Sequence, residues 1–161
     1  RRTIQIKIPA GVETGTRIKI AGEGESGTAG GESGDLYVVI YVKQHEFFKR
    51  DGNNLYCEIP IGLVQASLGT ELLVPTLNGK TIKLKIPPET QTNSVFRLRG
   101  GGVPFLHGYG EGDLHVKVTV ETPTNLTNKE KELLKEFAHM RGEDINPRPK
   151  SLYEKIKKSF K

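Results

Sequence analysis

Glycines near the N-terminus form the first pattern that could do chemistry. Residues 22–27 read GEGESG and match the GxGxxG spacing with which dinucleotide-binding loops cradle phosphates. That chemistry needs an α-helix directly after the loop, because the phosphates lie at the helix N-terminus. More glycine follows here, and Glu23 and Glu25 would repel phosphate. We therefore interpret residues 22–34 as a flexible loop and expect no cofactor.

Serine, histidine and cysteine residues give no catalytic pattern. Ser26 and Ser33 each lie in a GESG sequence, one residue short of a nucleophile elbow. A single cysteine, Cys57, cannot build a structural zinc site, and it alternates with other apolar residues, so we expect it in the core. The histidines show no metal-ligand spacing: His45, His107, His115 and His139. We assign no catalytic or metal residue and expect a protein that is not an enzyme.

Two of these histidines, His45 and His115, lie at the ends of expected strands. Partial burial is the commoner fate of a histidine there.

An internal duplication organises the elements around these residues. Residues 3–20 read TIQIKIPAGVETGTRIKI, and residues 81–98 read TIKLKIPPETQTNSVFRL, at an offset of 78 positions. The offset continues without a gap to GDLYV at 34–38 and GDLHV at 112–116. Self-similarity over about forty residues indicates two copies of one structural unit.

Each copy reads as β structure. Ile4, Ile6 and Ile8 alternate at period two, which predicts a half-buried strand over 3–8. Asn78-Gly79 between two alternating runs predicts a hairpin tip. Strand material at 54–76 precedes the second copy, and its counterpart would lie upstream of residue 1, so we expect an incomplete first unit whose Ile4 strand has an exposed edge.

Residues 35–43, 55–60, 94–98 and 113–120 are also predicted to be strands, and 61–68 one or two helical turns closed by Gly69.

The two adjacent phenylalanines, Phe47 and Phe48, abut a strand end. Strand side chains alternate between faces, so both cannot point into one core. A solvent-side phenylalanine beside a free strand edge suits β-augmentation, in which a peptide adds a strand and an apolar side chain fills a pocket. The alternative, that both rings pack under loops, is left open by the sequence.

The period changes to helical from Pro123. Thr127 and Glu130 form a capping box, which explains Thr127 better than its place in a glycosylation sequon does. An apolar stripe follows to about residue 140, and further apolar residues spaced four apart suggest a second short helix. The two sets are Leu133, Leu134, Phe137 and Met140, and Leu152, Ile156 and Phe160.

Charge and composition argue against two classes of binding partner, nucleic acid and membranes. The net charge of +5 lies wholly in the tail from residue 147, which has six basic residues and one acidic residue, so the body is neutral and nucleic acid is not expected as a partner. No apolar run approaches the ~18 residues of a membrane span, so no membrane partner is expected either. One cysteine excludes an internal disulfide and favours a reducing, cytoplasmic location.

Five stretches carry a family pattern. They are IKIPAGVETGTRIKIAGEGE (6–25), GDLYVVIYVKQHEFFKRDGNNLYCEIPI (34–61), LGTELLVPTLNGKTIKLKIPPETQT (68–92), GDLHVKVTVETP (112–123) and LTNKEKELLKEF (126–137). The chain closely resembles the C-terminal substrate-binding and dimerisation region of the bacterial DnaJ family of J-domain co-chaperones. The resemblance covers nearly the whole chain but includes neither a J domain nor the family's zinc-binding cysteine-rich insertion.

The resemblance implies fold and function. We expect a mainly β protein with two tandem, β-sandwich-like units, the first truncated, followed by C-terminal helices. The expected divisions are 1–46 (remainder of the first domain), 47–122 (second domain) and 123–161 (helical dimerisation segment and basic tail). Such a module would bind exposed apolar segments of unfolded clients for transfer to a DnaK-type chaperone in protein folding and the heat-shock response. Zinc is expected only in the parent protein.

The resemblance also implies site residues. Ile4, Ile6 and Phe48, with Phe47, would line the client groove of the first domain. The homodimer contacts would come from the C-terminal helix: Leu133, Leu134, Phe137, Met140, and with them Ile156 and Phe160. A competing hypothesis is a scaffold that only dimerises and spaces the arms of the parent protein.

Overall fold

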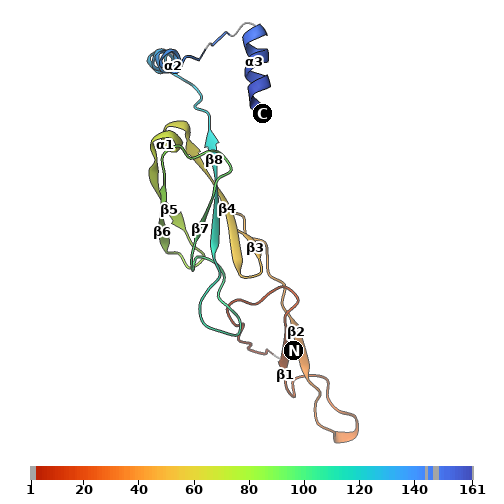
Figure 1. Cartoon of the computed structure of the whole chain (residues 1–161). Helices are drawn as coiled ribbons and strands as arrows, with labels where there is room; N and C mark the ends of the chain where they lie inside the picture. Colours follow the sequence, from red (N-terminus) through yellow and green to blue (C-terminus); the bar gives the residue numbers. More distant parts are fainter. Residues whose placement is uncertain (1–2, 144, 147–148, 161) are drawn as a thin grey trace. The chain divides into compact units, whose positions relative to one another are not determined.

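The computed structural model describes residues 3–143, 145–146 and 149–160 (Figure 1). The chain divides into unit 1, Arg1–Glu121, and unit 2, Thr122–Lys161. Unit 1 holds the strands and unit 2 holds the two longer helices, so the expected mainly β fold with C-terminal helices is confirmed.

A four-stranded sheet forms the larger part of unit 1. Its strands are β3 (Lys49–Asp51), β4 (Asn54–Gly62), β8 (Leu114–Glu121) and β7 (Val95–Leu98), in the order β3-β4-β8-β7. β4 and β8 pair in parallel, from Leu55 opposite Leu114 to Gly62 opposite Glu121, and the other two pairs are antiparallel. Leu114, Val116 and Val118 of β8 are fully buried, because a β-strand turns every second side chain toward the same face.

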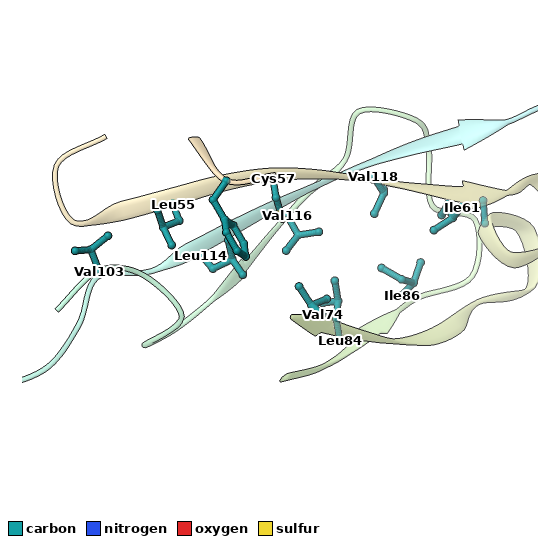
Figure 2. Packing of buried hydrophobic residues seen from close by; sticks show 12 residues of the cluster. Leu55, Cys57, Ile61, Val74, Leu84, Ile86, Val103, Leu114, Val116 and Val118 are labelled. Carbon is teal, nitrogen blue, oxygen red and sulfur yellow. The ribbon is translucent and has the colours of Figure 1, made fainter. Parts of the chain in front are cut away.

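A second layer covers that buried face. β5 (Thr70–Pro75) and β6 (Thr81–Ile86) form an antiparallel pair, and α1 (Leu63–Leu68) connects β4 to β5. Figure 2 shows Val74, Leu84 and Ile86 of this pair pointing toward the side chains of β4 and β8. The buried cluster is Phe48, Leu55, Cys57, Ile61, Ala66, Val74, Leu84, Ile86, Val103, Leu114, Val116 and Val118. The sandwich-like packing is therefore present in this part of the chain.

The first copy keeps the second copy's hairpin geometry. β1 (Arg17–Ile20) pairs antiparallel with β2 (Leu36–Val39), and each pair in its register, moved by 78 residues, is a pair between β7 and β8. The loop bonds also match. The Gly24 amide donates to the Gly34 carbonyl at 2.7 Å, and the Gly102 amide to the Gly112 carbonyl at 2.9 Å. The duplication read from the sequence is thus a duplication of structure.

The predicted strand over residues 3–8 is wrong. The structure assigns no strand there, and Ile8 is exposed, whereas its equivalent in the second copy, Ile86, is buried in β6. β6 is a strand because β5 pairs with it, and no described strand pairs with residues 3–8. The alternation of isoleucines alone cannot supply backbone partners.

The Asn78-Gly79 turn lies between β5 and β6 as predicted, but its conformation differs from a two-residue turn. Only Gly79 of the two has a positive φ, at 78°. The Thr76 amide donates to the Lys80 carbonyl at 2.9 Å, and the Gly79 amide to the Thr76 carbonyl at 3.1 Å. These bonds describe a three-residue loop with glycine in the left-handed position.

Unit 2 contains α2 (Asn128–Met140) and α3 (Pro149–Ser159). The predicted capping box is confirmed: the Glu130 amide donates to Thr127 Oγ1 at 3.2 Å, and the Thr127 amide donates to Glu130 Oε2 at 2.7 Å. This exchange satisfies two backbone donors that a helix N-terminus otherwise leaves free, so it fixes where α2 begins.

Candidate functional site

The residues that could have done chemistry are not gathered into a reactive cluster. Among the described residues, no group of three or more His, Cys, Asp or Glu side chains could hold a metal ion. The loop at 22–27 is followed by a short 3-10 turn, η1 (Thr28–Gly30), and not by the α-helix that a dinucleotide would need. The glycine-rich loop therefore lacks the helix that a dinucleotide-binding site requires.

Cys57 lies in the core of unit 1, as the sequence predicts. Its side chain is 4% exposed, and desolvation raises the pKa of the thiol from its ordinary 9.0 to about 11. The thiolate is the nucleophilic form of cysteine, so this residue is held in its unreactive form at neutral pH.

A hollow of about 860 Å³ lies in unit 1 where the first copy meets the start of the second. Its apolar lining comes from Val42, Phe47, Phe48, Leu55, Leu77 and Val103. The charged residues along it are Glu13, Lys43, Glu46, Lys49 and Arg50. An apolar lining accompanied by charges of both signs suits a short apolar peptide segment better than a highly charged ligand.

The two phenylalanines take different positions in this hollow. Phe48 is 6% exposed and belongs to the core of unit 1, whereas Phe47 is 37% exposed. Their rings meet edge to face with centroids 4.8 Å apart. One ring is buried and the other remains accessible, as the alternation argument requires.

His45 holds the turn that separates these rings. Its Nδ1 accepts hydrogen bonds from the Phe47 amide at 3.0 Å and from the Phe48 amide at 3.1 Å. The expectation that His45 is partly buried at a strand end is wrong: it is exposed and lies in the loop between β2 and β3. Its polar contacts are backbone amides of the next turn, so it stays at the surface.

Arg50, on β3, forms hydrogen bonds to the backbone of the first copy. Its Nη1 donates to the Val12 carbonyl at 2.7 Å and its Nη2 to the Gly11 carbonyl at 3.0 Å. Gly11 also fits closely against the loop after β7, since a Cβ there would lie 2.2 Å from the Pro104 carbonyl oxygen. This arginine's role could not be predicted from the sequence, because its partners are carbonyl groups that every residue carries.

Ile4 and Ile6 are half-buried but do not line the hollow. The structure thus brings Phe47 and Phe48 together and leaves the two isoleucines outside that surface. Val42 and Leu77 line the hollow and were missed by the sequence reasoning. The apolar end of the 35–43 run was the available signal for Val42, and Leu77 lies in the turn before Asn78.

The predicted apolar residues of unit 2 are exposed, on α2, on α3 and at Phe160 directly after α3. The α2 residues are between 37% and 78% exposed, and Ile156 and Phe160 are 50% and 87% exposed. The residues concerned on α2 are Leu133, Leu134, Phe137 and Met140. Neither helix in the described part of the chain is long and apolar enough to cross a membrane.

Comparison with known proteins places these features in a family. A family model described as the DnaJ C terminal domain matches residues 1–123, and one described as the chaperone protein DnaJ C-terminal region matches residues 129–161. The chaperone protein DnaJ of Halalkalibacterium halodurans is 55% identical over 161 residues, which is all of this chain and 43% of the relative.

Other relatives agree. The chaperone protein DnaJ of Geobacillus kaustophilus is 53% identical over 162 residues, and that of Desulfitobacterium hafniense is 53% identical over 160 residues. This chain covers 42% of each. The chain therefore spans less than half the length of the curated relatives it matches, and it belongs to the DnaJ C-terminal domain family.

Proposed function

We propose that this chain is a co-chaperone module that binds exposed apolar segments of unfolded polypeptides. The observation that carries the proposal is Phe47, an accessible aromatic ring at the edge of an apolar hollow in a member of the DnaJ C-terminal domain family. A large accessible ring beside a recess can be covered by a client side chain, at roughly 25 cal/mol of stabilisation per Å² removed from water.

Strand addition supplies the second part of the binding energy. β1 and β2 form a two-stranded sheet whose outer edges have no partner strand among the described residues. An extended client can donate and accept backbone hydrogen bonds along such an edge whatever its sequence. We place Ile4 and Ile6, with Phe47 and Phe48, in the client-binding surface, the isoleucines on the strength of the family resemblance.

The longer protein extends this role. We propose that clients pass from this module to a DnaK-type chaperone during protein folding and the heat-shock response. We also propose three divisions: a first substrate-binding remainder at 1–46, a second β domain at 47–122 and a helical dimerisation segment with a basic tail at 123–161. The lone buried cysteine is compatible with the reducing cytoplasm, where we place the protein.

Neither catalysis nor a bound metal is part of the proposal for this chain. The relatives are named as chaperones, and the one cysteine is buried in the core. These residues do not fit the family's zinc site, so zinc remains an expectation for a cysteine-rich segment of the parent protein. Nucleic acid and membranes are likewise not among the proposed partners.

The exposed helices carry the proposed homodimer. A stripe of Leu133, Leu134, Phe137 and Met140 on α2 is a large apolar surface for one short helix. Two copies of this stripe would cover each other, as a symmetric dimer interface does. We include Ile156 of α3 and Phe160, the residue after that helix, in the same interface.

Peptide titration tests client binding. The chain has no tryptophan, so an apolar peptide carrying a single tryptophan reports binding by its own fluorescence. Phe47→Ala should weaken binding about 5- to 30-fold, the equivalent of 1–2 kcal/mol for a partly exposed ring. Phe48→Ala is a poorer probe, because removing a buried phenylalanine costs about 3–5 kcal/mol of stability.

Leu73→Ala is the matched control, since Leu73 is 68% exposed on β5 and does not line the hollow. It should bind like the parent chain. Equal binding by Phe47→Ala and the parent chain would remove Phe47 from the site. If the unsubstituted 161-residue chain does not bind the peptide, the competing hypothesis is favoured, in which the chain is a scaffold that only dimerises.

A further inference from the structure

We propose that His45 is a positioning residue for the client surface: its neutral imidazole caps the turn that presents Phe47 and buries Phe48. The inference rests on the proposed function and adds to it the group that sets the geometry of its central ring. It also assigns a tautomer to His45, because the imidazole can accept these bonds at Nδ1 only when that nitrogen carries no proton.

The geometry is that of a side-chain cap. Two successive amides, from Phe47 and Phe48, donate to the same Nδ1 at 3.0 and 3.1 Å. An asparagine or aspartate caps a turn in the same manner, accepting from amides two and three positions ahead. The His45 ring also contacts the Phe48 ring, with centroids 5.1 Å apart and planes tilted by 47°.

A cap is needed here because no ladder holds this backbone. β2 ends at Val39 and β3 begins at Lys49, so the Phe47 and Phe48 amides lie in the connection between strands. Without the imidazole, the accepting partner of both amides is lost, and the chain can reorient about the Phe47–Phe48 peptide. The buried Phe48 ring anchors one end of the turn, and His45 fixes the other.

The cap specifies the histidine's protonation state. An imidazole nitrogen accepts a hydrogen bond only when it carries no proton, so Nδ1 must be free and the proton must lie on Nε2. Protonation of Nδ1 turns the acceptor into a donor that faces two other donors.

The test compares two substitutions in the 161-residue chain with the tryptophan-labelled apolar peptide. His45→Ala removes the acceptor and should weaken binding about tenfold. His45→Asn places Oδ1 near the position of Nδ1 and should stay within about twofold of the parent chain. His107→Ala is the control, because His107 is exposed and makes no hydrogen bond within the described residues. Failure of asparagine to rescue binding overturns the proposal.

A spectroscopic arm is independent of client binding. Nitrogen-15 NMR of the His45 ring should show the Nε2–H form in the folded chain at about pH 8, where ordinary histidines are neutral. A ring protonated at Nδ1 overturns the proposal even if peptide binding is normal. Conversely, a chain with the Nε2–H form but no peptide binding overturns the proposed function and keeps the cap.

Discussion

Two neighbouring residues of one type, Phe47 and Phe48, differ sharply in exposure. The 6% exposure of Phe48 makes it part of the core, and the 37% exposure of Phe47 makes it available to a partner. Their separation depends on a turn at 45–48 and on one acceptor atom. A substitution in this turn therefore acts on binding through orientation, and a substitution of Phe48 acts through stability.

Cys57 gives a pH prediction. The folded-state pKa of about 11 exceeds the ordinary 9.0, so above about pH 9 the unfolded chain loses its proton first and ionisation favours unfolding. The stability from burying the neutral thiol is therefore complete below about pH 9 and is lost as the pH rises to about 11.

Urea unfolding of the parent chain and Cys57→Ala measures this loss. Cys57→Ala should be the less stable at about pH 8, and its deficit should shrink as the pH approaches 11. A deficit that stays constant across this range would show that the thiol does not ionise differently in the two states.

At the scale of elements, the duplication could be predicted from the sequence, because apolar residues and glycines recur at a fixed offset of 78 positions. The registers of β1 with β2 and of β7 with β8 follow from it. Whether residues 3–8 form a strand could not be predicted in the same way, since a strand needs a neighbouring strand for its backbone hydrogen bonds, and the alternating pattern does not supply one. The contacts of Arg50 and His45 were not readable either, because both side chains bond to backbone groups that carry no sequence signal.

Gly79 tests the turn between β5 and β6. Its φ of 78° favours glycine, so Gly79→Ala should cost about 1–2 kcal/mol of stability. Gly108 is the control, because it lies in a loop without a positive φ, and the nearest atom to its added Cβ would be 3.9 Å away. Urea unfolding compares the two, and equal stability of both variants would contradict the assigned turn.

Arg50 tests the junction between the copies. Arg50→Met removes the donors to the Val12 and Gly11 carbonyls and to the Gly52 carbonyl, the last at 2.8 Å from Nε. We expect a loss of about 1–3 kcal/mol and faster amide hydrogen exchange across residues 9–20, measured by mass spectrometry.

Lys49→Met is the matched control for Arg50. Lys49 is an exposed cation on the same hollow, and its side chain makes no hydrogen bond or ion pair within the described residues. Its exchange pattern should match that of the parent chain. Equally fast exchange in both variants would mean that charge, and not the bonds of Arg50, holds the junction.

At the scale of the whole molecule, unit 2 gives the prediction on assembly. Sedimentation equilibrium should find a dimer for the 161-residue chain and a monomer after deletion of residues 126–161. Leu133→Lys with Phe137→Lys should give the monomer without shortening the chain, because burying an unpaired cation costs several kcal/mol. Lys135→Ala, on the same helix and 61% exposed at its side chain, should remain dimeric. A monomeric parent chain contradicts the assignment.

The parallel pairing of β4 with β8 has a consequence for synthesis of the chain. Leu55 pairs opposite Leu114, so the strand that begins the buried layer waits for a partner made 59 residues later. At translation rates of 5–20 residues per second this interval lasts about 3–12 s. During it, Leu55, Cys57 and Ile61 lack the β8 side chains that bury them. The chain is proposed to bind exposed apolar segments of unfolded polypeptides. During its own synthesis it thus exposes a segment of the same kind.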